Sequence, residues 1–291
     1  MSTSMQQSFG NHPHAECDTP RPRGVVGRAM ELELIPRLLA HARGTVPGVE
    51  PPANPVPTLD AGDVDALVQA CLSYDEERCP AIVTRLLEAG VPLERVCLDL
   101  LAPAARALGD MWEEDQVDFL EVTLGLGRMQ RVVRDIGRRV SALTPMSSDA
   151  GQVFLCAMPD EQHSLGLAML AEFFVADGWG VTVGHPLGNS DVVHEVGAHW
   201  YDVVGLSAGV TQRIPKIAEL VAGVRAASLN ADLAIMVGGR AFLNDPSLVD
   251  RVGADASAPD AAQGPMVART LVQALRASFG QHSPPSTHPS Q

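Results

Sequence analysis

The chain has 291 residues, enough for about two domains, and carries 35 acidic residues against 21 Lys and Arg, a formal net charge of −14. This balance argues against a protein that binds nucleic acid or an anionic membrane directly, because those contacts are made mainly by Lys and Arg. Hydrophobic residues make up 46% of the chain, which supports a sizeable core and excludes wholesale disorder. Aromatic residues make up only 4%, so an aromatic side chain near a pocket is informative.

Cysteine usage and the absence of targeting signals indicate a soluble, cytoplasmic protein. The five cysteines, at positions 17, 71, 79, 97 and 156, contain no Cys-x-x-Cys pair. An odd, scattered set fits a reducing compartment and predicts buried, inert thiols, with a redox role for Cys71, Cys79 or Cys97 as the alternative. The N-terminus lacks a signal sequence, and no apolar run reaches the roughly 20 residues of a membrane span.

The two ends of the chain are predicted to lie outside the folded domains. Residues 1–23 and 280–291 are rich in Ser, Pro and His and are predicted to be disordered. Residues 24–43 form a predicted amphipathic helix whose apolar stripe must bury against this chain or a partner. Residues 44–58, with five prolines, form a semi-extended linker.

Residues 59–146 predict an all-α bundle. Four apolar stripes at helical spacing indicate four helices joined by short turns. Asp60 and Asp63 are typical N-cap residues for the first helix. Gly90 with Pro92 predicts one break between helices, and Gly109 predicts another.

Residues 150–279 predict a doubly wound α/β domain. Apolar strands alternate with helices, and this pattern is typical of a parallel sheet covered on both faces. The predicted strands are 153–157, 180–183, 203–206, 233–237 and 254–256. The predicted helices are 165–176, 191–199, 215–227, 247–251 and 265–277. The fold class is therefore a Rossmann-like (flavodoxin-like) α/β domain preceded by an all-α helical-bundle cap.

Polar and small residues follow three of these strands, at the edge where ligands bind in open parallel sheets. Glu161 and His163 follow the first strand, and a carboxylate that accepts a hydrogen bond from one imidazole nitrogen leaves the other nitrogen free to bind a metal. Gly166 relieves crowding where this loop enters its helix. The other strand ends carry Ser207, Gly209, Gly238 and Gly239, where a long ligand has room to approach the backbone.

Each of these features alone also fits an ordinary structural role, but their combined spacing resembles the cobalamin-binding signature Asp-x-His-x-x-Gly, Ser-x-Leu and Gly-Gly. The resemblance implies that His163 is the lower ligand of cobalt and that Glu161 orients it. It further implies that Ser207, Gly209, Gly238 and Gly239 line the slot for the nucleotide tail of cobalamin, and that Gly166 belongs to the same cofactor site. This chain departs from the pattern at Glu161, where Asp is usual, and at Gly209, where Leu is usual.

The cap carries a second part of the resemblance, in Trp112 and Phe119. In light-sensing cobalamin regulators, a bundle Trp covers the upper face of the corrin and a following Glu-His pair contacts an adenosyl group. Trp112 is present, but Glu121 is followed by Val122, so the resemblance favours a small upper ligand such as water or hydroxide over adenosyl. The alternative is that Trp112 is a core residue of the bundle.

The helix at 24–43 and the segment 111–119 resemble the AerR/PpaA group of photosynthesis regulators in purple bacteria. Membership implies a light-responsive antirepressor, without enzymatic activity, that acts on a photosynthesis-gene repressor of the CrtJ/PpsR type. DNA would be reached only through that partner, in agreement with the acidic charge.

Two alternative functions use the same scaffold. One is a corrinoid protein that carries methyl groups for a separate methyltransferase. The other is a haem sensor, in which the axial nitrogen comes from one of His163, His185, His194 and His199. Hydrolysis by side chains alone is disfavoured, because no Gly-x-Ser-x-Gly elbow, phosphate loop or zinc motif is present.

Overall fold

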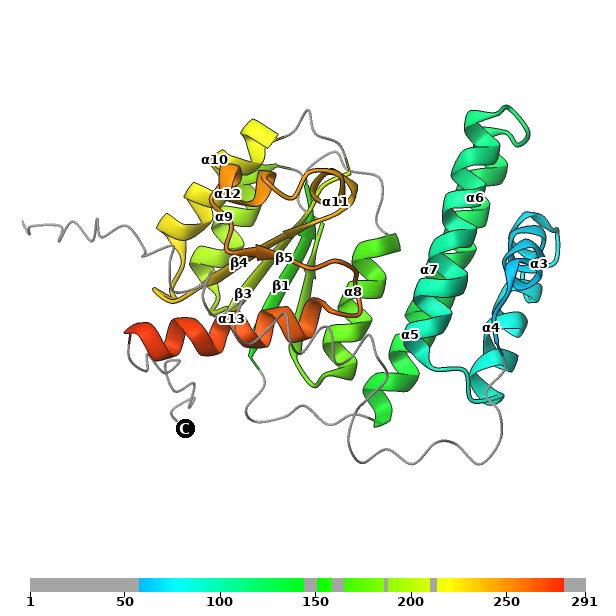
Figure 1. Cartoon of the computed structure of the whole chain (residues 1–291), viewed down its shortest axis with the longest axis horizontal. Helices are drawn as coiled ribbons and strands as arrows, with labels where there is room; N and C mark the ends of the chain where they lie inside the picture. The colour runs from blue at the N-terminus through cyan, green and yellow to red at the C-terminus, as the bar shows by residue number, and fades with distance from the viewer. Residues whose placement is uncertain (1–57, 144–150, 159–164, 186–187, 210–213, 280–291) are drawn as a thin grey trace, which may run out of the picture.

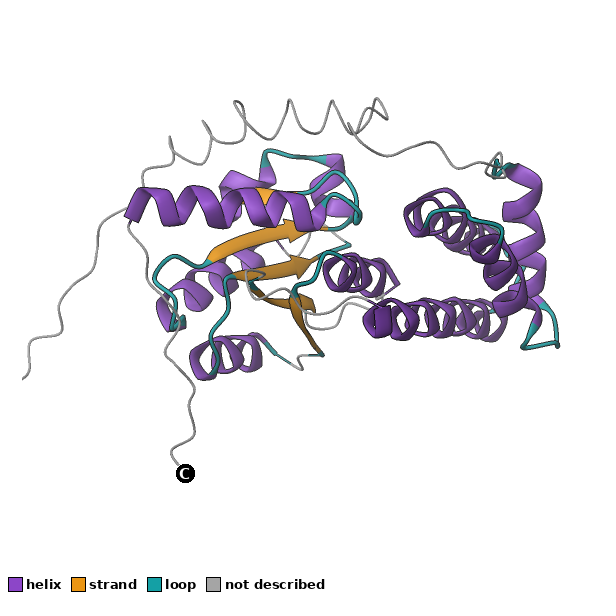
Figure 2. Ribbon diagram, turned by 90° about the horizontal axis from the view of Figure 1, so that it is seen from below, coloured by secondary structure: helices purple, strands orange, loops and turns teal. Residues whose placement is uncertain are grey.

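The computed structural model describes residues 58–143, 151–158, 165–185, 188–209 and 214–279. The predictions for residues 1–57 and 280–291 lie outside the described residues. Figures 1 and 2 show a group of helices beside a parallel sheet that other helices cover on both faces. The predicted fold class, a helical cap followed by a Rossmann-like α/β domain, is confirmed.

The cap contains the predicted helices, with one unpredicted π-helical stretch. Its elements are α3 (Ala61–Leu72), α4 (Arg78–Glu88), α5 (Leu93–Arg95), the π-helix η2 (Val96–Leu101), α6 (Ala102–Glu113) and α7 (Phe119–Leu143). Asp60 caps α3, because its Oδ1 accepts hydrogen bonds from the backbone N–H groups of Gly62 and Asp63 at 2.8 and 3.2 Å. The carboxylate of Asp63 accepts a bond from the N–H of Asp60 in return.

The break predicted at Gly90 is confirmed, and the break predicted near Gly109 lies further along the chain. Gly90 follows α4 with φ of +86°, a left-handed conformation that glycine adopts without strain. Gly109 lies inside α6 instead of ending it. The chain leaves α6 only after Glu113 and turns through Asp115, which has φ of 58°. A single glycine costs a helix only about 1 kcal/mol, so packing along the rest of α6 carries the helix past it.

The α/β domain has one five-stranded parallel sheet in the order β2-β1-β3-β4-β5. Its strands are β1 (Gln152–Ala157), β2 (Gly180–Gly184), β3 (Val203–Ser207), β4 (Ala234–Gly238) and β5 (Ala256–Ser257). Its helices are α8 (Leu165–Ala176), α9 (Asn189–Ala198), α10 (Ile214–Ala227), α11 (Arg240–Asn244), α12 (Leu248–Val252) and α13 (Gly264–Phe279). The short helix α11 is the one element here that the sequence pattern did not predict.

Two apolar layers enclose the sheet. One face packs against α9, α10, α11 and α12 through the side chains of alternate residues such as Phe154 and Leu206. The other face packs against α8 and α13 through residues such as Leu155 and Met236. Because side chains alternate along a strand, each strand contributes to both layers, which explains its nearly continuous apolar sequence.

Helix α8 joins the cap to the α/β domain. Its residues Leu165, Met169 and Phe173 belong to the core of the cap, whereas Leu167 and Phe174 belong to the layer beneath the sheet. A helix that buries two opposite faces has to be apolar all round, as the sequence LGLAMLAEFFVA is. This shared helix fixes the cap against the sheet (Figure 1).

Candidate functional site

Three small residues form the last rung of the sheet at its carboxyl edge. In the strand register Ser207 pairs with Ala157 on one side and with Gly238 on the other. The backbone N–H of Met158 donates to the carbonyl of Ser207 at 2.9 Å, and the N–H of Ala208 donates to the carbonyl of Gly238 at 2.9 Å. These bonds hold the ends of β1, β3 and β4 together, and we call Ala157, Ser207 and Gly238 the small-residue rung.

The small-residue rung lies on the face of the sheet that α8 and α13 cover. Side chains alternate along each strand, so its members continue the columns of Leu155, Gly205 and Met236 one step further toward the carboxyl edge. Leu155 and Met236 are buried, but all three members of the rung are partly exposed. Among the described residues, their short side chains leave room at the end of this layer for a narrow group entering from the carboxyl edge.

The strand order places this rung where open α/β sheets bind ligands. The chain runs from β1 outward to β2 and then returns to β3 on the other side of β1. Crevices form at such a reversal, between the loops that leave the two central strands. Here those loops leave after Met158 and Ala208, beside the small-residue rung.

The two glycines of the Gly238-Gly239 pair differ in whether the backbone requires a glycine there. Gly239 has φ of +93° and ψ of 174°, and a Cβ atom there would lie 2.3 Å from the carbonyl oxygen of Ala208. Only glycine fits that backbone crossing. At Gly238 and at Gly166, by contrast, a Cβ atom would meet no atom of the described residues within 4 Å. Gly209 follows Ala208 beyond the end of β3 and is partly exposed.

Glu161 and His163 lie outside the described residues, so their predicted roles are not tested here. Their segment leaves the sheet after Met158 and re-enters the described chain at Leu165, the first residue of α8. Met158 and Leu165 are both buried. Met158 is fixed in the layer that α9 and α10 cover, and Leu165 is fixed in the core of the cap.

The cap presents large apolar side chains at the turn between α6 and α7. Trp112 is 48% exposed, Phe119 68% and Leu120 62%. The alternative reading of Trp112 as a core residue of the bundle is therefore wrong. Figure 1 places this turn at the same end of the molecule as the carboxyl ends of the strands. The sequence analysis did not single out Leu120 or Ala157, and strand register was the only signal for the latter.

The remaining candidate histidines do not converge. His199 ends α9, near the start of β3 and so at the opposite edge of the sheet, where its Nδ1 lies 3.0 Å from a carboxylate oxygen of Glu195. His185 follows β2 at the carboxyl edge and is exposed, and His194 is exposed on α9. Within the described ranges, no group of three or more His, Cys, Asp or Glu residues could hold a metal.

Cys156, next to the small-residue rung, is not a reactive thiol. Its side chain is buried on the opposite face of the sheet, beneath α9 and α10. Burial raises the pKa of the thiol from 9.0 to about 12, so it stays neutral at physiological pH. Among the described residues of the small-residue rung, the groups available to a ligand are therefore the Ser207 hydroxyl and the backbone.

Comparison with known proteins identifies both domains. Residues 151–264 match the family described as B12 binding domain, and residues 64–134 match a second family with the same description. The two parts of the chain therefore each match a B12-binding domain, which supports cobalamin as the ligand.

Several known proteins are similar to this chain over more than half of its length. An uncharacterized 20.5 kDa protein from the bchF-crtJ intergenic region of Rhodobacter capsulatus is 26% identical over 167 residues, which are 57% of this chain and 86% of the relative. Monomethylamine corrinoid protein 2 of Methanosarcina acetivorans is 21% identical over 72% of this chain and 97% of its own. The solved structure of the Methanosarcina barkeri monomethylamine corrinoid protein superposes with a TM-score of 0.59 at 21% identity, covering 71% of this chain and 97% of that one.

The described residues fit cobalamin on both sides. The open space beside Gly238 and the partly exposed small-residue rung suit a narrow chain such as the nucleotide tail. The exposed faces of Trp112 and Phe119 suit a broad, flat ring such as the corrin. None of the described helices is both long and apolar enough to cross a membrane.

Proposed function

We propose that this protein is a light-responsive antirepressor, which binds cobalamin and acts on a photosynthesis-gene repressor of the CrtJ/PpsR type. The observation that carries the proposal is the relative from the bchF-crtJ intergenic region of Rhodobacter capsulatus, combined with the two B12-binding domains. The net charge of −14 suits a protein that reaches DNA through a partner instead of binding its phosphates.

In this proposal the predicted site residues bind and orient cobalamin. His163 supplies the lower nitrogen ligand of cobalt, and Glu161 fixes the tautomer of His163 by accepting its other N–H. Ser207 and Gly238 line the entry of the nucleotide tail, with Gly166 and Gly209 beside it. Trp112 and Phe119 cover the other side of the ring. Cobalamin in its aquo or hydroxo form supplies the light absorption and an exchangeable ligand.

A regulator also needs two states that bind its partner differently. The cap and the α/β domain meet along α7 and α8, and the exposed side chains of Trp112 and Phe119 lie at the α6–α7 turn, where α7 begins. The α6–α7 turn is therefore the described part of the cap that would contact bound cobalamin. This turn is the proposed bistable element.

The first experiment tests the lower ligand. The full chain is reconstituted with hydroxocobalamin in darkness, and absorption is recorded before and after illumination. His163→Ala should lose the spectrum of histidine-coordinated cobalamin. His185→Ala is the matched control, because His185 is exposed at the end of the neighbouring strand and should leave the spectrum unchanged. An unaltered spectrum in His163→Ala would remove His163 from the site.

The second experiment tests the partner. The cobalamin-loaded chain is titrated into the photosynthesis-gene repressor from its own organism, and Kd is measured in darkness and in light. A light-dependent change in Kd is expected, because only a difference in affinity between the two states can shift the repressor. Absence of binding under both conditions contradicts the antirepressor proposal.

A methyl-carrier function is the second candidate. It is supported by the monomethylamine corrinoid proteins, whose similarity spans 72% of this chain. Transfer of an isotopically labelled methyl group between the loaded protein and a methyltransferase, together with a light-independent Kd for the repressor, would favour it. A haem sensor on the same scaffold is distinguished at once by a Soret band in place of the cobalamin maxima.

A further inference from the structure

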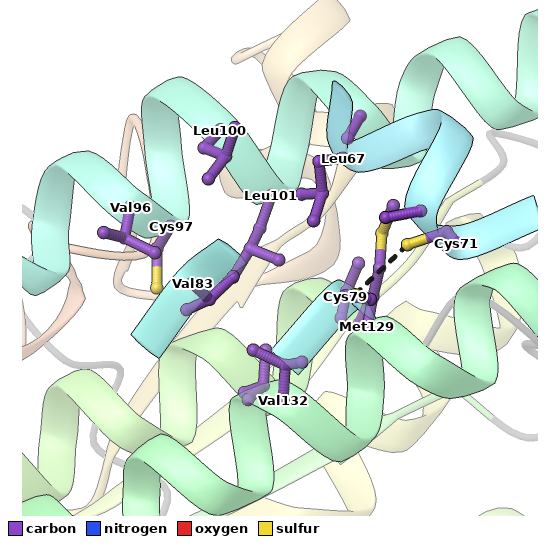
Figure 3. Packing of buried hydrophobic residues seen from close by; sticks show 14 of the residues in the cluster. Leu67, Cys71, Cys79, Val83, Val96, Cys97, Leu100, Leu101, Met129 and Val132 are labelled. Carbon is purple, nitrogen blue, oxygen red and sulfur yellow. Dashed lines mark hydrogen bonds between the residues drawn. The ribbon is translucent and has the colours of Figure 1, made fainter. Parts of the chain in front are cut away.

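Two buried cysteines of the cap meet across the turn between α3 and α4 (Figure 3). Cys71 lies in the last turn of α3 and Cys79 in the first turn of α4. Their Sγ atoms are 3.3 Å apart, and neither side chain is exposed to solvent. The cysteine spacing in the sequence does not predict this contact.

The guanidinium of Arg128, on α7, lies beside the pair. Its Nη1 donates hydrogen bonds to the carbonyl oxygens of Cys71 and Ser73 at 2.5 and 2.6 Å. The bond donated by the Cys71 thiol and the positive charge of Arg128 lower the pKa of the Cys79 thiol. The same bond and burial raise the pKa of Cys71, which keeps its proton. Cys79 is therefore the more readily ionised thiol of the pair, and Cys71 is placed to donate a hydrogen bond to it.

We propose that Cys71 and Cys79 form an oxidation site, at which a hydroperoxide converts the two thiols into an intramolecular disulfide. The thiolate of Cys79 attacks one peroxide oxygen, the O–O bond breaks, and the leaving oxygen takes up a proton to become water when the oxidant is hydrogen peroxide. Cys71 then loses its proton and attacks the sulfur of the resulting sulfenic acid, which releases a second water. Two thiols and one hydrogen peroxide give one disulfide and two waters.

The geometry allows this bond with a small movement. A disulfide is about 2.05 Å long, so the sulfur atoms have to approach by roughly 1.3 Å. The residues that join the two helices, Tyr74 to Glu77, are exposed, so the turn can move without opening the core. The same exposed turn is the route by which a small oxidant reaches the sulfur atoms.

The other buried cysteines lack these features. Burial raises the pKa of Cys97 and of Cys156 to about 12, and neither has a sulfur partner among the described residues. A neutral, isolated thiol reacts slowly with peroxide. Peroxide should therefore oxidise Cys71 and Cys79 faster than Cys97 or Cys156 in the same protein.

The cysteine pair also packs against α7, the helix whose first residue is Phe119. A Cβ atom at Gly125 of α7 would lie 3.7 Å from the Cβ of Cys71 and 3.1 Å from the side chain of Leu108. Contraction of the pair therefore shifts α3 against α7 at a point where the packing has little spare room. Six residues before Gly125, α7 begins with the exposed Phe119.

Trypsin offers a sharp test, because Arg78 lies between the two cysteines. The full chain is exposed to hydrogen peroxide, free thiols are alkylated, and the protein is digested without reduction. Cleavage after Arg43, Arg78 and Arg85 places Cys71 in peptide 44–78 and Cys79 in peptide 79–85. We expect these two peptides to be joined only after oxidation, with a mass lower by two hydrogen atoms than the sum of the reduced peptides.

Matched variants complete the test. Cys97→Ser should leave the joined peptides unchanged, and Cys71→Ser should abolish them. Arg128→Gln should slow the reaction several-fold at neutral pH, whereas Arg128→Lys, which keeps the charge, should slow it less. Separate alkylated peptides under conditions that oxidise a free thiol would overturn the proposal. Joining of Cys71 to Cys97, or sulfinic acid on Cys79 without a joined peptide, would overturn it as well.

Discussion

The two regions that face the candidate site expose opposite kinds of surface. The cap leaves Trp112, Phe119 and Leu120 uncovered at the turn between α6 and α7. The α/β domain instead ends its three central strands in the short side chains of Ala157, Ser207 and Gly238. Each region is otherwise well packed, with a core of buried apolar side chains. The contrast is therefore confined to two places, the α6–α7 turn of the cap and the carboxyl edge of the sheet.

This difference matches the two parts of cobalamin. Exposed aromatic side chains gain most from covering a flat ring, because they lose contact with water over a large area. Small residues at a sheet edge bury little surface against a ring. They leave space that longer side chains would fill, and a narrow tail can enter that space. The comparison predicts that the α/β domain sets whether cobalamin enters, and that the cap adds affinity by covering it.

The largest expected effect comes from the backbone on the α/β side. Gly239→Ala would place a methyl group against the Ala208 carbonyl in a conformation that is essentially restricted to glycine. We expect the free energy of unfolding to fall by roughly 2–4 kcal/mol, measured by urea denaturation without cobalamin. Gly166→Ala is the control and should cost nothing, since no atom of the described residues lies within 4 Å of its Cβ position and the residue is helical. Equal losses in both variants would contradict the assignment of Gly239.

The neighbouring glycine should separate binding from stability. Gly238→Val fills open space at the small-residue rung with a side chain that suits a strand. The free energy of unfolding should change by less than about 1 kcal/mol, while the affinity for hydroxocobalamin falls at least about tenfold, or 1.4 kcal/mol. Equilibrium dialysis with hydroxocobalamin measures this. Unchanged affinity would mean that the tail does not pass Gly238.

On the cap side a smaller loss of affinity is expected. Trp112→Ala removes one of the exposed aromatic faces, and we expect hydroxocobalamin affinity to fall about three- to tenfold, because stacking is worth about 0.5–1.5 kcal/mol. Tyr74→Ala is the matched control, since Tyr74 is a fully exposed aromatic residue at the α3–α4 turn. A loss of the same size in both variants would indicate a general effect on the cap instead of contact with the ring.

The sequence predicted the architecture well because its signals are local. Apolar strands alternating with helices predicted the sheet, and the spacing of Ser207 and Gly238 predicted that they meet at one edge. The predictions that failed concerned features that depend on tertiary packing. Gly109 was taken as a helix end, although α6 continues through it.

The distinct roles of Gly238 and Gly239 could not be read from the sequence either. They depend on a backbone crossing between strands that are distant in the chain. The contact of Cys71 with Cys79 depends on the path of a turn that cysteine spacing does not encode. Residues Glu161 and His163 remain sequence predictions.

The smallest expected effect concerns the contact that holds the two regions together. Glu172 is the one charged residue of α8, and its carboxylate lies where a Cβ atom at Gly137 of α7 would be. Burial raises the pKa of Glu172 from 4.5 to about 6. The folded state therefore binds this proton more tightly than the unfolded chain, and the contribution of Glu172 to stability is greatest below pH 4.5 and declines as the pH rises to about 6.

Glu172→Gln tests this contact, because glutamine has nearly the same shape but carries no charge to bury. At pH 7 the variant should be more stable than the parent by up to about 1 kcal/mol, a value reduced to allow for partial solvent screening. Below pH 4.5, where Glu172 is protonated in both states, the difference should vanish. The free energy of unfolding measured at both pH values checks this. A variant that is less stable than the parent at pH 7 would show that the carboxylate makes a favourable contact between α8 and α7, and that burial is not its dominant effect.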